Sequence, residues 1–179
     1  DVTEYSLLLM GNEDSVTFTP KALDSTGATV KVNNVVVPFG EASAAIAMAV
    51  GANQPVFITV IAEDESYTKT YTINPTRLSG DNKLAAINLS EGSLSPAFNK
   101  DINDYNVNVG SDVTSITLSA LVNDTGNATI LINGKPISNA HPSLPISLEP
   151  GVNVIEVTVV AQDGSVNTYT ITINKEPGK

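Results

Sequence analysis

The sequence of 179 residues contains no cysteine, no tryptophan and one histidine. The lack of cysteine excludes disulfide bonds, zinc–thiolate centres and thiol nucleophiles. Lys and Arg together number 9 against 19 Asp and Glu, which gives a formal net charge of −10. Binding of nucleic acid needs a concentrated basic surface, and an acidic surface is repelled by anionic lipid headgroups. We therefore expect neither nucleic-acid binding nor membrane insertion.

No apolar run reaches the length of a membrane-spanning helix, and the chain starts at Asp1 rather than at a methionine. These features suggest a piece of a longer exported protein, located outside the cell or on its surface. Hydrophobic residues make up 41% of the chain, which is enough for packed cores. The abundance of Val, Ile and Thr favours β-strands over helices.

An internal repeat organises the chain. Residues 1–9 resemble residues 101–109, and after the loss of one residue 56–64 resembles 155–163. A repeat of this length has the size of a whole β-sandwich domain. We predict a first domain over 1–75, a linker over 76–82, a second domain over 83–175 and a tail over 176–179.

Within each copy the apolar residues recur at every second position, as in Tyr105, Val107 and Val109. This period indicates antiparallel sheets with one face in a core. Asn133-Gly134 is typical of a two-residue hairpin turn. The sequence thus predicts an all-β fold of two tandem antiparallel β-sandwiches, with about seven short strands per copy and no helix. The Ala-rich stretch 42–52 is also expected to be a strand.

An ordered series of motifs also carries a family resemblance. It comprises Leu84–Phe98, Asp104-Tyr105, Ala128–Gly134 and Val159–Tyr169, and it covers nearly all of the second copy. The series resembles the bacterial cadherin-like β-sandwich domain. The resemblance implies an Ig-like/cadherin-like sandwich of the kind repeated in large exported proteins, often beside S-layer anchoring modules or polysaccharide-active enzymes. It brings no known catalytic residues.

The first copy departs from this pattern. It has no counterpart of Leu84–Phe98, so the first strand of the family is missing. A sandwich without that strand exposes unpaired backbone groups and part of its core. We expect the first copy either to show an open edge or to take part in strand exchange with another chain. It also has Glu65 near the hairpin position where the second copy has Gly164.

Catalytic chemistry has little support in the sequence. His141 stands in a loop, where we expect a solvent-exposed residue rather than a general base. The acidic residues fall mostly in turns of small domains, which form no deep pocket for a carboxylate pair. We predict that the chain is not an enzyme; a hydrolase is the alternative, which generic ester, peptide and glycoside substrates would test.

Calcium is the only cofactor the sequence suggests. Asp101, Asn103 and Asp104 resemble part of the Asp-x-Asn-Asp calcium segment of true cadherins, and calcium binds six to eight oxygen ligands. The alternative is a turn in which Asp and Asn side chains bond to their own backbone. Further acids that could contribute ligands are Asp64, Asp81 and Asp163.

Sugar binding would require exposed aromatic rings. Tyr5, Tyr71, Tyr105 and Tyr169 occupy matching strand positions in the two copies, so we expect them in the cores or at interfaces. Tyr67, in a hairpin of the first copy, is the candidate glycan contact.

These observations favour a non-catalytic structural or interaction module, of the spacer or adhesion type, in an exported bacterial surface protein. Its expected partners are the neighbouring domains of a larger polypeptide and a cell-surface protein or glycan. The alternative is an accessory carbohydrate-binding module of a polysaccharide-degrading enzyme.

Overall fold

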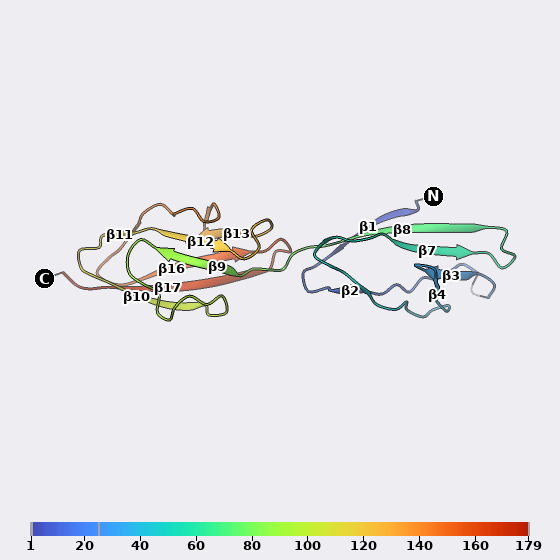
Figure 1. Ribbon diagram of the computed structural model, residues 1–179, viewed down its shortest axis with the longest axis horizontal. Helices are drawn as coiled ribbons and strands as arrows, with labels where there is room; N and C mark the ends of the chain where they lie inside the picture. Colours follow the sequence, from blue (N-terminus) through green and yellow to red (C-terminus); the bar gives the residue numbers. More distant parts are fainter. Residues whose placement is uncertain (1, 25, 179) are drawn as a thin grey trace. The chain divides into compact units, whose positions relative to one another are not determined.

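The computed structural model describes residues 2–24 and 26–178. Over these residues the chain forms strands and turns without helix, so no helix is present that could cross a membrane. The chain divides into unit 1, Asp1–Ser79, and unit 2, Gly80–Lys179 (Figure 1). The strand β8 (Thr68–Arg77) continues into the stretch 76–82, which the sequence suggested as a linker.

Unit 1 contains one main sheet and a small facing pair. Its strands are β1 (Glu4–Leu9), β2 (Ser15–Val16), β3 (Thr29–Val32), β4 (Val35–Val36), β5 (Ile46–Ala47), β6 (Gly51–Ala52), β7 (Val56–Ile61) and β8. The main sheet has the order β1-β8-β7-β3-β4, with β6 also on β8, and β2 pairs with β5. The Ala-rich stretch 42–52 therefore contains two short strands.

Unit 2 repeats this plan with two strands that have no counterpart among the described residues of unit 1. Its strands are β9 (Leu84–Leu89), β10 (Asp104–Val109), β11 (Ser115–Ile116), β12 (Leu118–Val122), β13 (Thr129–Ile132), β14 (Lys135–Ile137), β15 (Ile146–Ser147), β16 (Gly151–Val160) and β17 (Val166–Lys175). The main sheet has the order β10-β17-β16-β13-β14. The pairs β11–β15 and β12–β9 form the remaining sheets.

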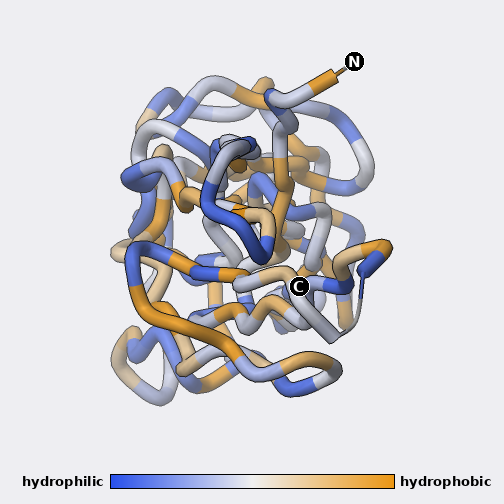
Figure 2. The backbone as a smooth tube through the Cα atoms, turned by 90° about the vertical axis from the view of Figure 1, so that its right-hand side faces the viewer, coloured by the Kyte–Doolittle hydropathy of each residue, from blue (hydrophilic) through white to orange (hydrophobic). Residues whose placement is uncertain are grey.

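The alternation of apolar and polar residues translates into burial. In β10 every second side chain is buried. Figure 2 shows hydrophobic (orange) and hydrophilic (blue) positions interspersed along the backbone. The all-β sandwich prediction is confirmed. Leu144 alternates in the sequence with Ile146 and Leu148, which predicts a core position, but it is 81% exposed because it lies in the loop before β15. A run of alternating residues that contains two prolines does not specify where the strand begins.

The hairpin turns follow the residues that the sequence offers. Asn133 and Gly134 both have positive φ, as the two-residue turn between β13 and β14 requires. Gly164 has φ +84° at the turn between β16 and β17. In the matching turn of unit 1, Glu65 adopts φ +57°, a left-handed conformation that is strained for a residue with a Cβ.

Each unit contains one parallel strand pair, which the alternation pattern alone does not indicate. β1 lies parallel to β8, and β10 lies parallel to β17, each over six residue pairs. The pair therefore joins the first strand of each main sheet to the last strand of its unit.

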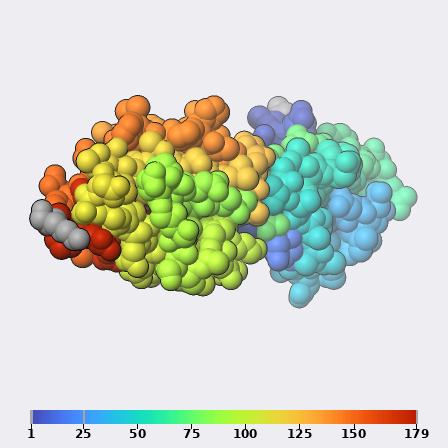
Figure 3. All heavy atoms as spheres, turned by 60° about the vertical axis from the view of Figure 1, so that its left-hand side comes forward, coloured from blue at the N-terminus to red at the C-terminus, as the bar shows by residue number. Residues whose placement is uncertain are grey.

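The cores of the two units differ because β9 covers one side of the core in unit 2. In unit 2, β9 pairs antiparallel with β12 and contributes Leu84 and Ile87 to the core. In Figure 3 the segment that includes β9 and the following loop, coloured green, forms part of the surface of unit 2. Unit 1 has no strand equivalent to β9 among its described residues, and its residues 17–24, which match β12, form no strand.

A cation fastens the last strand of each unit. The Arg77 guanidinium donates hydrogen bonds to the carbonyl oxygens of Gly11 and Met48. In unit 2 the Lys175 ammonium donates to the carbonyl oxygen of Leu148 at 3.1 Å. Arg77, which the sequence placed in a linker, thus belongs to the structure of unit 1.

Candidate functional site

The residues proposed for calcium lie at the start of β10, and Asn103 has a structural role there. Its side-chain amide donates to Asn167 Oδ1 at 2.8 Å and to the Thr168 carbonyl oxygen at 3.0 Å. Its own carbonyl oxygen accepts a bond from the Thr170 amide at 2.7 Å. These bonds hold the residue before β10 against β17.

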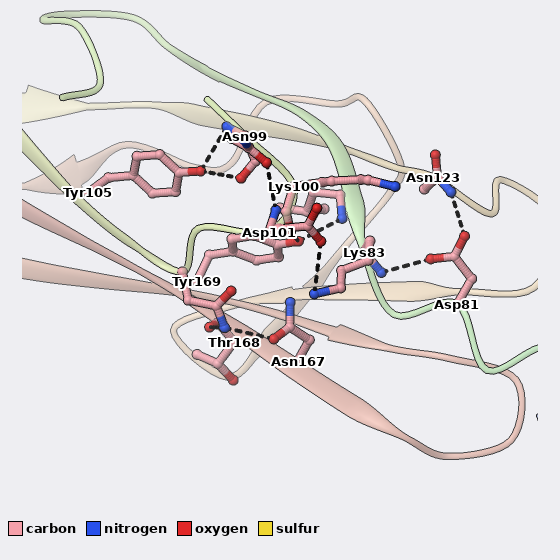
Figure 4. A network of polar contacts seen from close by, with 12 residues as sticks. Asp81, Lys83, Asn99, Lys100, Asp101, Tyr105, Asn123, Asn167, Thr168 and Tyr169 are labelled. Atoms are coloured by element: carbon pink, nitrogen blue, oxygen red, sulfur yellow. Dashed lines mark hydrogen bonds and ion pairs between the residues drawn. The ribbon is translucent and has the colours of Figure 1, made fainter. Parts of the chain in front are cut away.

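The two acids of this segment do not gather with further acids. Asp101 Oδ1 lies 3.6 Å from Lys83 Nζ, and its carboxylate is largely exposed (Figure 4). Asp104 is exposed at the first position of β10. Within the described ranges 2–24 and 26–178, no three His, Cys, Asp or Glu side chains come close enough to share a metal ion. Calcium binding stays a prediction, which a calorimetric titration with calcium chloride tests.

The other acids named as calcium ligands accept hydrogen bonds within their own turns. Asp163 Oδ1 accepts from the Ser165 amide at 2.8 Å, and Asp81 Oδ1 accepts from the Lys83 amide at 3.0 Å. Asp64 Oδ1 accepts from the hydroxyl and the amide of Ser66, which lowers the pKa of that carboxyl. Each carboxylate thereby stabilises a turn.

Figure 4 shows a network in which two tyrosines hold the loop between β9 and β10. The Tyr105 hydroxyl donates to the Asn99 carbonyl oxygen at 2.6 Å and accepts from the Asn99 amide at 3.0 Å. The Tyr169 hydroxyl donates to the Lys100 carbonyl oxygen at 2.8 Å and accepts from the Leu84 amide at 3.1 Å. Burial raises the pKa of Tyr169.

Phe98 completes this arrangement from the same loop. Its ring centroid lies 6.0 Å from that of Tyr105, in a stacked geometry, and 6.3 Å from that of Tyr169. Both tyrosines are at most 1% exposed. The expectation of core positions is confirmed for these two residues.

The matching tyrosines of unit 1 have a different environment. Tyr5 is 45% exposed and donates to the nearby Val2 carbonyl oxygen at 3.1 Å, so it is not a core residue, and its position at an interface stays a prediction. Tyr71 is half-buried, with the Lys69 ammonium 5.2 Å from its ring centroid. In unit 2 the segment Leu84–Phe98 covers the equivalent rings, whereas no described residue of unit 1 takes its place.

These tyrosines line a groove of about 530 Å³ in unit 1. Tyr67, the candidate glycan contact, lies at the same groove and is 65% exposed. Apolar side chains from three strands of the main sheet form its floor, and the irregular segment 20–24 forms one wall. They include Val30, Ile58, Val60 and Ile73. The sequence indicated the open edge but not a groove lined by three tyrosines.

The remaining candidate, His141, is exposed in the loop before β15. Its Nδ1 lies 3.0 Å from the Asn139 carbonyl oxygen. This position agrees with the expected loop residue. The groove of unit 1 is therefore the candidate site that the geometry favours.

A family model described as "Cadherin-like beta sandwich domain" matches residues 1–78 and 84–176. A "putative membrane protein" of Evansella cellulosilytica is 36% identical over 98 residues, which is 55% of this chain. The match covers 15% of that longer protein.

Solved structures with a similar fold have low sequence identity. The fibronectin(III)-like modules of Clostridium thermocellum CbhA are 13% identical, with a TM-score of 0.38, and the match covers 98% of this chain and 90% of theirs. The human CDH23 EC21-23 structure is 12% identical, with a TM-score of 0.38, and the match covers 97% of this chain and 72% of that one.

Proposed function

The chain belongs to the cadherin-like β-sandwich domain family, and from this premise we propose that it is a non-catalytic spacer and interaction module of an exported bacterial surface protein. One observation carries the spacer role: in each unit the first strand of the main sheet pairs in parallel with the last strand. The 36% identical relative, named a membrane protein, supports the surface location.

The parallel pairs determine how a unit responds to tension. β10 and β17 run in the same direction, so the start of β10 and the end of β17 lie at opposite ends of the pair. Tension along the chain enters unit 2 through β9, which precedes β10. Once it reaches the start of β10, a pull between that point and the end of β17 loads all bonds between the two strands together, along the strand direction. The strands must slide as a whole before any bond is released, which resists extension better than opening one bond at a time.

A proline in β10 tests this role. The Thr170 and Glu176 amides donate to the carbonyl oxygens of Asn103 and Val109, so the odd-numbered residues of β10 face β17. Val107→Pro removes one donor from the pair, and we expect a lower unfolding force for unit 2 in single-molecule pulling of the whole chain. Val107→Ala is the control, because it keeps the amide while removing buried methyl groups. Equal forces for both variants would contradict the spacer role.

A second candidate function is carbohydrate binding, favoured by the three tyrosines at one groove. Tyrosine faces stack on sugar rings, and Lys21 and Asp24 at the rim offer hydrogen-bonding groups. A glycan array of cell-wall and plant polysaccharides tests it, with Tyr67→Ala expected to abolish any signal. Tyr169→Phe, in unit 2, is the control variant that should keep the signal.

A further inference from the structure

The groove of unit 1 matches a face that is covered in unit 2. Its floor residues Ile58, Val60 and Ile73 are half-buried, whereas the matching Val157, Val159 and Ile171 are fully buried. In unit 2 these residues share one core with Leu84 and Ile87 of β9, and Phe98 packs against that core. The repeat within this chain therefore shows which side chains fill the equivalent space.

We propose that this groove binds a donor strand: an extended segment with the sequence pattern of Leu84–Phe98 that reaches the groove from the N-terminal side of β1. Such a strand completes unit 1 and is independent of how either unit bears load. The pattern consists of apolar residues at the positions of Leu84, Ile87 and Leu89, followed by the aromatic ring of Phe98.

The backbone of unit 1 is oriented to pair with such a strand. The backbone of Phe18 points away from the open side: its amide donates to Ser43 Oγ, and its carbonyl oxygen accepts from the Ser43 amide. Leu118 makes the same two bonds with Ser143 in unit 2, where the opposite side of the strand pairs with β9. The N–H and C=O groups of Thr17 therefore point to the open side of unit 1, which is the side that β9 covers in unit 2. The N–H and C=O groups of the next odd-numbered residues point the same way.

Pro20 fits this register. It matches Ala120, whose carbonyl oxygen accepts from the Ala140 amide and so faces away from β9. A proline at this position costs no bond to a donor strand, because its missing N–H would lie on the far side.

The tyrosines provide the second part of the site. Tyr105 and Tyr169 bond to Asn99 and Lys100 of the loop after β9. Tyr5 and Tyr71 stand at the same positions at the groove of unit 1. A segment that places a ring like Phe98 between them would bury both tyrosines and give their hydroxyls the same backbone partners.

Connection through the start of β1 is favoured by the geometry of unit 2. There β9 precedes β10 in the chain, and only Asn99 to Asn103 separate Phe98 from β10. Such a short connection gives a tethered strand a high effective concentration at its groove.

The test fuses a copy of residues 83–100 directly ahead of residue 1 of the full chain. The copy of Lys100 then directly precedes Asp1, just as Lys100 precedes Asp101. We expect amide hydrogen exchange at Thr17, Thr19 and Lys21 to slow at least tenfold. The control extension has serine in place of the added copies of Leu84, Ile87 and Phe98, and it should leave exchange unchanged.

A free peptide of residues 83–100, added to the unextended chain, forms the second arm. Protection by the extension, with or without protection by the peptide, supports the proposal. Protection by the peptide alone would overturn the N-terminal connection, and no protection in either arm would overturn the donor strand. Slowed exchange on addition of a polysaccharide, without effect of either segment, would assign the groove to a glycan instead. The pulling experiment on unit 2 is independent of all these outcomes.

Discussion

The hydroxyl of Tyr169 joins the Lys100 carbonyl oxygen to the Leu84 amide, which lie 16 residues apart in the sequence. Replacing Tyr169 by Phe leaves the buried Leu84 amide and the partly buried Lys100 carbonyl oxygen without this partner. We expect unit 2 to lose about 1–3 kcal/mol of unfolding free energy. Urea unfolding followed by residue-resolved NMR measures the change in each unit.

Tyr71→Phe provides the matched control, because Tyr71 stands at the same position of unit 1, where no equivalent loop is present among the described residues. Its expected effect is within about 0.5 kcal/mol. If both variants lose the same free energy, the network around Tyr169 does not stabilise unit 2 as described.

The same hydroxyl predicts a dependence on alkaline pH. Burial raises the pKa of Tyr169 above its ordinary value of 10.0, so on raising the pH the unfolded state loses its proton first. The stabilising effect of the neutral hydroxyl is complete below pH 10 and is lost as the pH rises through the raised pKa. We expect the difference in unfolding free energy between the native chain and Tyr169→Phe to be constant below about pH 9 and to shrink above pH 10.

Using the difference between two chains removes the contribution of all other groups that titrate in this range. A difference that grows above pH 10 would show that the ionised form of Tyr169 is the one favoured by the fold.

Much of the fold could be predicted from the sequence, because alternation and turn residues are local signals. Tyr105, Val107 and Val109 are buried as expected, and Asn133-Gly134 forms its hairpin. The parallel pairing of β10 with β17 depends on residues more than 60 positions apart and leaves no local pattern.

The candidate site was harder to predict than the fold. Tyr5 stands at the same strand position as Tyr105, but Tyr5 is exposed and Tyr105 is buried. The burial of Tyr105 depends on the segment Leu84–Phe98, which belongs to the second copy. Equal residues therefore differ in exposure because their neighbours differ. Likewise, Asp101 resembles a calcium ligand in the sequence, but the nearest charged partner of its carboxylate is the Lys83 ammonium.

The strained turn of unit 1 predicts a stabilising substitution. Glu65 has φ +57°, whereas Gly164 occupies the matching turn of unit 2 with φ +84°. Glu65→Gly removes the clash of the Cβ in the left-handed region, and we expect a gain of about 0.5–1 kcal/mol for unit 1 after the entropy cost of glycine. Thermal unfolding with residue-resolved detection measures it.

The reciprocal variant is Gly164→Ala, which should destabilise unit 2 by about 1 kcal/mol. Apart from the two neighbouring residues, no part of the protein lies within 4 Å of the position a Cβ would take at Gly164, so the backbone conformation accounts for the loss. A neutral Gly164→Ala variant would argue against strain at either turn.

The hydrogen bonds of Arg77 predict that this side chain stabilises unit 1 by holding its last strand. Its guanidinium bonds to the carbonyl oxygens of Gly11 and Met48, so Arg77→Met should cost unit 1 about 1.5–3 kcal/mol. Arg77→Lys should recover part of this loss, because Lys175 fastens the equivalent strand of unit 2 through a single bond to Leu148. Urea unfolding of the full chain, with NMR signals assigned to each unit, gives both values. If Arg77→Met and Arg77→Lys are equally stable, the charged bonds contribute nothing and the aliphatic part of the side chain accounts for its effect.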